Sequence, residues 1–95
     1  MILRIFTIEI VPEFREEFEA KYKVVSLNLV KSNDGFISAE IGRNINDNTY
    51  VMVSKWENLT AIKKFAGASW NKAVIPEEME KYAVSYDIKH YHKEF

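Results

Sequence analysis

The chain has 95 residues, a formal net charge of −1 and 47% hydrophobic residues, and this size and composition predict one globular domain over residues 1–95. No apolar run approaches the ~18 residues of a membrane-crossing helix, the N-terminal run lacks the cleavage site of a signal peptide, and the net charge gives no attraction to nucleic acid or an anionic membrane. The absence of cysteine excludes disulfides and thiolate metal sites, which agrees with the cytoplasmic location that we expect.

The first third of the sequence predicts a strand followed by a helix. Residues 1–10 are apolar at odd and even positions alike, which indicates a strand covered on both faces. Val11-Pro12 ends this strand, and proline suits the first turn of a helix. We expect the helix over residues 13–31, because an apolar stripe that we assign to the core recurs there at spacings of three and four: Phe14, Phe18, Tyr22, Val25 and Leu29.

A hairpin occupies the middle of the chain. The turn cluster Asn33-Asp34-Gly35 ends the first helix. Residues 36–43 and 49–57 are the next two predicted strands, and the polar segment 44–48 between them consists of turn-forming residues. The pair is therefore expected to be antiparallel.

The last third predicts a short helix, an irregular segment and a final strand. Asn58 is a suitable N-cap for a helix that ends at Gly67, with an apolar side formed by Leu59, Ile62, Phe65 and Ala66. Residues 68–82 are interrupted by Pro76, and one further helical turn is expected over residues 77–81. Residues 83–93 alternate as a strand, with Val84, Tyr86, Ile88, His90 and His92 on one face.

This order of elements predicts an α+β fold of the ferredoxin-like type, β-α-β-β-α-β, with an antiparallel sheet. Both helices then cover one face of the sheet, and the other face is open. The open face carries one apolar side of the first strand, and the third strand divides its apolar residues between Val51 and Val53 on one face and Tyr50, Met52 and Trp56 on the other. Because an apolar patch of that size is unusual on a monomer, we predict a homodimer in which two open faces meet.

One segment of the sequence resembles a family signature. Residues 54–67 read Ser-Lys-Trp-Glu-Asn-Leu-Thr-Ala-Ile-Lys-Lys-Phe-Ala-Gly, which is similar to the Trp-Glu-Ser, spacer, Ala-Ile, two residues, Phe-Ala-Gly pattern of the antibiotic biosynthesis monooxygenase-like family. Ala73-Val74 and His90-Tyr91 also match the habits of that family. The resemblance implies a dimeric α+β barrel, in a family that includes cofactor-independent monooxygenases of phenols or quinols and haem-degrading enzymes.

The haem-degrading branch of the family can be tested on these residues. The resemblance implies an Asn in the first strand, a Trp in the second helix and a haem-ligating His about ten residues later. The corresponding places hold Thr7, Phe65 and Ile75, so haem degradation is not expected and no cofactor is predicted. A metal site is not predicted either, because His90 and His92 have no evident third ligand.

Four residues of the predicted sheet carry groups that could act on a substrate. His90 is the candidate general base, because an imidazole near neutral pH can deprotonate a phenol, and His92 lies on the same strand face. The alternative for either histidine is a surface or hydrogen-bonded edge position. Tyr50 and Tyr86 could donate a hydrogen bond to a substrate oxygen, or they could be core tyrosines with satisfied hydroxyls.

Further residues are candidates for binding a substrate. Trp56 either anchors the second helix to the sheet or lines a pocket together with Phe65. Trp70 lies in the irregular segment, as a hydrophobic anchor or a ligand contact over the pocket. Arg4 interrupts an apolar strand, so it needs a partner such as Glu40, or it lies at a pocket mouth and holds an anionic substrate.

Two functions remain open at this point. The first is a cofactor-independent monooxygenase-like protein acting on a small aromatic substrate of the phenol or quinol type, in a pocket between the sheet and the helices. The alternative is a non-catalytic dimeric barrel that binds a small hydrophobic ligand or has a structural role. An RNA-binding module is disfavoured, because residues 48–54 lack the basic-Gly-aromatic motif. A pocket large enough for two or three rings would favour the enzyme.

Overall fold

The computed structural model describes residues 1–73 and 75–94, and the side chains of Ser26 and Leu29 stand outside the description. Its strands and helices follow the expected β-α-β-β-α-β order: β1 (Ile2–Ile10), α1 (Arg15–Lys31), β2 (Phe36–Arg43), β3 (Thr49–Trp56), α2 (Leu59–Ala66) and β4 (Ala83–His92). Three short 3₁₀ helices accompany them: η1 (Pro12–Phe14), η2 (Gly67–Ser69) and η3 (Glu77–Tyr82). None of the described helices is long and apolar enough to cross a membrane.

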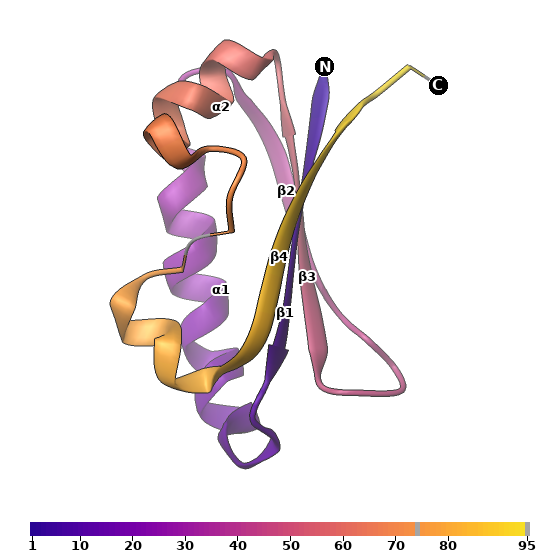
Figure 1. The fold of residues 1–95 in the computed structure, drawn as a ribbon, viewed down its shortest axis with the longest axis vertical. Helices are drawn as coiled ribbons and strands as arrows, with labels where there is room; N and C mark the ends of the chain where they lie inside the picture. Colours follow the sequence, from indigo (N-terminus) through magenta and orange to yellow (C-terminus); the bar gives the residue numbers. More distant parts are fainter. Residues whose placement is uncertain (74, 95) are drawn as a thin grey trace.

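The four strands form one antiparallel sheet in the order β2-β3-β1-β4. Both helices cover the same face of this sheet, and the opposite face is open (Figure 1). The central strand β1 therefore has a neighbour on each side, and Arg4 lies opposite Ser54 of β3 and His90 of β4. The predicted fold and its antiparallel sheet are confirmed.

The central strand β1 is largely apolar on both faces, as the sequence predicted. The side chains of Ile2, Phe6, Ile8 and Ile10 are buried beneath the helices. The alternate residues Leu3 and Ile5 are half-buried on the open face, where Ile5 lies opposite Val53. Regular alternation along paired strands produces this division, because successive side chains point to opposite faces of a sheet.

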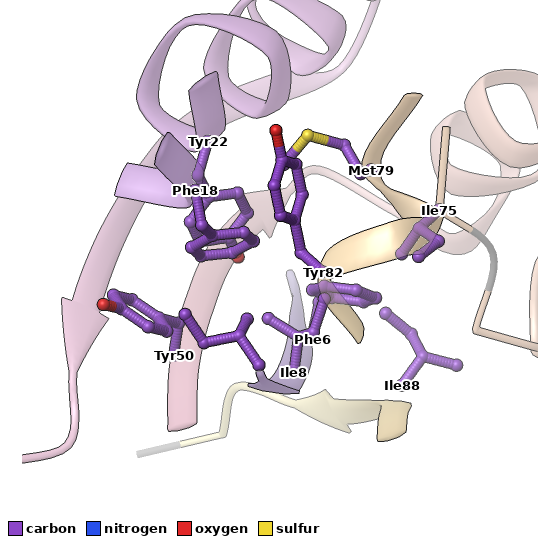
Figure 2. Packing of buried hydrophobic residues seen from close by; sticks show 10 residues of the cluster. Phe6, Ile8, Phe18, Tyr22, Tyr50, Ile75, Met79, Tyr82 and Ile88 are labelled. Atoms are coloured by element: carbon purple, nitrogen blue, oxygen red, sulfur yellow. The ribbon is translucent and has the colours of Figure 1, made fainter. Parts of the chain in front are cut away.

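The core consists of two clusters. The larger one joins α1 to the sheet: Figure 2 shows Phe18 and Tyr22 beside Tyr50, with the strand residues below them and Met79 and Ile75 on the far side. Phe14 is partly buried against this cluster, so the predicted helical stripe is confirmed as far as Tyr22. The smaller cluster surrounds the fully buried Trp56 and contains Ile2, Val30, Ala61 and Ile62.

The helices begin and end near the capping and turn residues that the sequence indicated. Asn58 is the N-cap of α2, and its Oδ1 accepts a hydrogen bond from the Ala61 backbone N–H at 2.9 Å. Gly35 adopts φ +82° between α1 and β2, a conformation that favours glycine. The first helix differs from the expected start at residue 13, because Pro12 opens a 3₁₀ turn before α1 begins at Arg15.

Candidate functional site

A cavity of about 80 Å³ lies between the helix-covered face of the sheet, α1 and the segment after α2. Its lining combines side chains from all of these elements: Arg4, Phe6, Ile8, Phe18, Tyr22, Val30, Met52, Phe65, Ile75, Pro76, Met79 and Ile88. Ten of these twelve residues are apolar, and the exceptions with polar side-chain groups are Arg4 and Tyr22. Of these two polar groups, the Tyr22 hydroxyl is itself buried, so the polar chemistry of the cavity wall depends on the Arg4 guanidinium.

Arg4 is a buried cation, with 9% of its surface exposed. Its Nη1 donates to the backbone carbonyl of Trp70 at 2.9 Å and lies 2.7 Å from His90 Nε2. The guanidinium carbon is 5.7 Å from the centroid of the Phe65 ring, within the range of a cation–π contact. Burial lowers the pKa of Arg4, but an arginine side chain keeps its proton at neutral pH.

No carboxylate of the described residues forms an ion pair with Arg4. The expected pairing with Glu40 was wrong, and the strand register explains why. Glu40 lies opposite Val53, which in turn lies opposite Ile5. Glu40 therefore belongs to the open face, and Arg4 points to the helix-covered face.

His90 is neutral in this arrangement. Arginine can only donate hydrogen bonds, so the Nε2 that faces Arg4 must be the accepting nitrogen, and the proton is assigned to Nδ1. Burial, and then the positive charge of Arg4, lower the pKa of His90 below its ordinary value. An imidazole in this state can accept a proton, provided that its Nε2 is released from Arg4.

Two aromatic residues complete the group, which we name the Arg4–His90 cluster: Arg4, Phe65, Trp70 and His90. The Trp70 ring meets the His90 ring edge-on, with the centroids 5.2 Å apart. Phe65 comes from α2 and also lines the cavity. The structure thus brings together four of the residues that the sequence indicated for a site, although they are up to 86 positions apart in the chain.

Tyr22 is the polar residue of the cavity that the sequence analysis assigned only to the core. It is 3% exposed, and its hydroxyl is buried without a hydrogen-bond partner among the described residues. Burial raises the pKa of this hydroxyl, so it keeps its proton at neutral pH. The sequence did offer one indication of this: Tyr22 stands in an apolar stripe where phenylalanine would fill the core without burying a hydroxyl group.

The two tyrosines predicted as hydrogen-bond donors to a substrate lie elsewhere. The Tyr50 hydroxyl donates to Glu19 Oε1 at 2.7 Å and accepts from Arg15 Nε at 3.4 Å, so it already has partners. Tyr86 is 43% exposed on β4, with its ring centroid 6.4 Å from that of Phe6. Neither residue lines the cavity.

Trp56 and His92 also lie outside the cavity lining. Trp56 is fully buried, its Nε1 donates to Ser54 Oγ at 2.9 Å, and its ring packs against Phe65 with centroids 5.1 Å apart. His92 is an exposed residue at the end of β4, opposite Ile2. Trp56 thus lies behind the cavity wall, where it packs against the lining residue Phe65.

The three places that correspond to the haem-degrading triad are divided by the fold. Phe65 and Ile75 line the cavity, and Thr7 lies opposite Val51 on the open face. The lining contains no histidine or cysteine, and no three metal-binding side chains gather among the described residues. The residues present therefore do not reproduce that haem site. Val74, a match to the family pattern, lies outside the described residues.

Solved structures share the fold over nearly their whole length. A candidate antibiotic biosynthesis monooxygenase from Nitrosomonas europaea matches with a TM-score of 0.78 and 10% identity, with 100% of each chain covered. One from Deinococcus radiodurans gives 0.76 and 14%, covering 98% of this chain and 92% of that one. The heme-degrader MhuD from Mycobacterium tuberculosis, solved with two hemes in its active site, gives 0.75 and 17%, covering 100% and 97%.

Comparison of the sequence itself assigns the family. Among curated proteins there is no significant match to this sequence. The model of the antibiotic biosynthesis monooxygenase family, however, matches residues 1–82, a range that contains Arg4, Tyr22 and the whole of α2. The chain therefore belongs to the antibiotic biosynthesis monooxygenase family.

Proposed function

We propose that this chain is a cofactor-independent monooxygenase-like protein that acts on a small phenol or quinol in the cavity between the sheet and the helices. One observation carries the proposal. A buried guanidinium that forms no ion pair with any carboxylate of the described residues lies at the wall of a largely apolar cavity and contacts a neutral imidazole. Such a pair can stabilise a phenolate and receive its proton, which is the activation that a reaction without flavin or metal requires.

His90 lies behind Arg4 and does not itself line the cavity. The proposed chemical step therefore starts when a substrate hydroxyl enters from the cavity between Arg4 and His90 and replaces their contact. His90 Nε2 accepts the phenol proton, and Arg4 donates to the resulting oxyanion. The electron-rich anion then reduces O₂ and combines with it. For a quinol, the products are a hydroxyquinone and water: one oxygen atom enters the ring, the other leaves as water, and the ring supplies all four electrons. No external reductant is needed.

The size of the cavity limits the substrate. About 80 Å³ is less than the ~150 Å³ of an apolar cavity that holds benzene and the ~300–1,000 Å³ of usual ligand pockets. A substrate of two or three rings therefore does not fit the cavity as it stands. We propose a single ring, admitted by repacking of Met52 and Met79, because methionine is the most adaptable apolar side chain.

The small cavity and the contact between Arg4 and His90 favour a second candidate function, a non-catalytic dimeric barrel that binds a small hydrophobic ligand or has a structural role. The cavity of about 80 Å³ is smaller than usual ligand pockets, and His90 Nε2 is already engaged by Arg4. In either case we propose a homodimer joined through the open sheet face, because Leu3, Ile5 and Val53 leave apolar surface there. The cytoplasmic location stays a prediction.

Oxygen uptake with a panel of single-ring phenols and quinols tests the enzymatic proposal. We expect uptake above the autoxidation background with wild type, and a loss of at least about 100-fold in His90→Gln, the usual scale for removing a general base. Arg4→Met should lose a similar factor, because the anion is no longer stabilised. Lys64→Gln, an exposed substitution on α2, is the matched control and should leave the rate unchanged.

Two outcomes would contradict the enzymatic proposal. Equal rates in wild type and His90→Gln would remove His90 from the reaction. No uptake above background, with saturable binding of the same compounds measured by calorimetry, would establish the non-catalytic binding protein instead.

A further inference from the structure

One edge of the Arg4 guanidinium has no partner among the described residues. A guanidinium presents five N–H groups in a planar fork, and both polar contacts of Arg4, to the Trp70 carbonyl and to His90, use Nη1. Its Nε and Nη2 make no hydrogen bond with a described residue. The fully buried polar side-chain atoms without a partner in that part of the chain are the Tyr22 and Tyr82 hydroxyls. Nε and Nη2 therefore keep accessible surface.

The charge of Arg4 is available to a ligand in the cavity. Arg4 is one of the lining residues, and only 9% of its surface is exposed, so bulk water hydrates its charge poorly. No carboxylate of the described residues forms an ion pair with it. A buried charge without a counter-charge is costly, and a ligand that brings a negative charge would remove this cost.

The shape of the Nε–Nη2 edge favours a carboxylate. Its two parallel N–H groups match the two oxygens of a carboxylate in a bidentate pair, whereas a phenolate offers a single oxygen. Lys63 adds a second positive charge near this end of the cavity, because its Nζ lies 5.5 Å from the centroid of the Trp70 ring. Charge and geometry thus select the same group.

We propose that the Nε–Nη2 edge of Arg4 binds the carboxylate of a small apolar monocarboxylic acid, whose hydrocarbon tail occupies the cavity. The proposal rests on the proposed function only in that the cavity is the ligand site, and it requires neither oxygen chemistry nor a phenol. The volume of about 80 Å³ selects a short tail, which contacts Phe6, Met52 and Ile88. His90 keeps its contact with Nη1. Such an acid competes with the proposed substrate for the same space.

Three probes of nearly equal size test the proposal. Propionate and propionamide differ in charge, and acetate carries the same carboxylate on a tail that is one methylene shorter. Each is titrated into isotope-labelled wild type at neutral pH and constant ionic strength, and NMR follows the Nε–H signal of Arg4. Propionate should bind about 100-fold more tightly than propionamide, because it forms a charge-assisted bidentate pair. It should bind about fourfold more tightly than acetate, the value of one buried methylene. The Arg4 Nε–H signal should shift on binding.

Three variants locate the binding edge. Arg4→Lys keeps a cation and removes the planar fork, so the preference for propionate over propionamide should fall at least about tenfold. Lys63→Gln is the matched control, because Lys63 is exposed and does not line the cavity, and the affinity should change less than about twofold. His90→Gln should also stay within about twofold, because the carboxylate does not use Nη1.

Five results would overturn the proposal: equal affinities of propionate and propionamide in wild type, no binding of either, an Arg4 Nε–H signal that does not move, a preference that survives in Arg4→Lys, or a loss in a control variant as large as in Arg4→Lys. The first three need wild type alone, so they decide the question even if Arg4→Lys does not fold.

Failure of this proposal is distinguishable from failure of the proposed function. Oxygen uptake that is lost in His90→Gln, with no preference for propionate in wild type, refutes only the carboxylate site. A preference for propionate without any oxygen uptake refutes only the catalysis.

Discussion

In the Arg4–His90 cluster a cation is buried without an ion pair to any acidic side chain that the structure describes. Its guanidinium contacts a backbone carbonyl of Trp70, an imidazole and the face of Phe65, none of which cancels its charge. Removing a full charge from water is costly unless it is paired. We therefore expect an anionic group of a ligand to bind Arg4, and the contact from Arg4 to His90 is the one that we expect a substrate phenolate to replace.

The titration of His90 should be visible in the stability of the protein. Its pKa is lower in the folded state than the ~6.5 of an exposed histidine, so the unfolded chain binds the proton more readily. Stability is then fully present above about pH 6.5 and decreases as the pH falls toward the folded-state pKa. Between pH 7.5 and 5.5, the Tm of wild type should fall about one or two degrees more than that of His90→Gln. Equal falls in the two proteins would contradict the shift.

Tyr22→Phe should stabilise the free protein. The hydroxyl is buried and has no hydrogen-bond partner among the residues that the structure describes. Such a group costs about 1–3 kcal/mol of stability, so its removal should raise the free energy of unfolding by about 1 kcal/mol. Urea denaturation without ligand measures this. A lower free energy of unfolding in Tyr22→Phe would mean that the hydroxyl already has a partner.

At the scale of the elements, the turn between α1 and β2 fixes where α2 can lie. Gly35 has a positive φ, and a Cβ added to it would lie 2.5 Å from the Cβ of Ala61. This close approach brings the first turn of α2 against the start of β2. Phe65, which is on the same helix, is thereby held over Arg4.

Gly35→Ala should be strongly destabilising, because it combines an unfavourable backbone conformation with a clash against α2. We expect a loss of about 2–4 kcal/mol, measured by urea denaturation. Gly67→Ala is the matched control: its φ is +75°, but no atom lies within 4 Å of an added Cβ, so only the backbone cost of about 1 kcal/mol applies. Similar losses in the two variants would mean that the packing against Ala61 does not matter.

For the whole molecule, the proposed homodimer depends on the open sheet face. Val53→Lys places a charge at its centre, beside Glu40 and Ile5, and should convert the proposed dimer into a folded monomer. Light scattering should then give 11.1 kDa in place of twice that mass. Val24→Lys changes an equally apolar but exposed residue of α1 and should remain dimeric. A monomeric wild type at micromolar concentration would contradict the proposal.

The sequence predicted the fold well, because its signals are local. A run that is apolar at odd and even positions identified β1, and alternation identified β4. The stripe from Phe14 to Tyr22 identified α1, and Asn58 marked the start of α2. The site was less predictable, because its contacts depend on the pairing of strands that are distant in the chain. Arg4 meets His90 only through the register of β1 with β4, which no spacing in the sequence reveals. The Tyr22 hydroxyl has no hydrogen-bond partner among the described residues, and this too depends on packing that the sequence does not reveal.

The register of β4 has a consequence for folding. β4 is an edge strand, paired only with β1, and a slip by one residue turns every side chain to the opposite face. Such a slip would set Lys89 or Tyr91 against Arg4 in place of His90, so one direction brings two cations together in a desolvated place and the other forces an additional large ring into it. The charge of Arg4 should thus also disfavour misaligned pairing of β4 with β1. The guanidinium to which we assign a role in ligand binding would then also favour the correct register of the last strand.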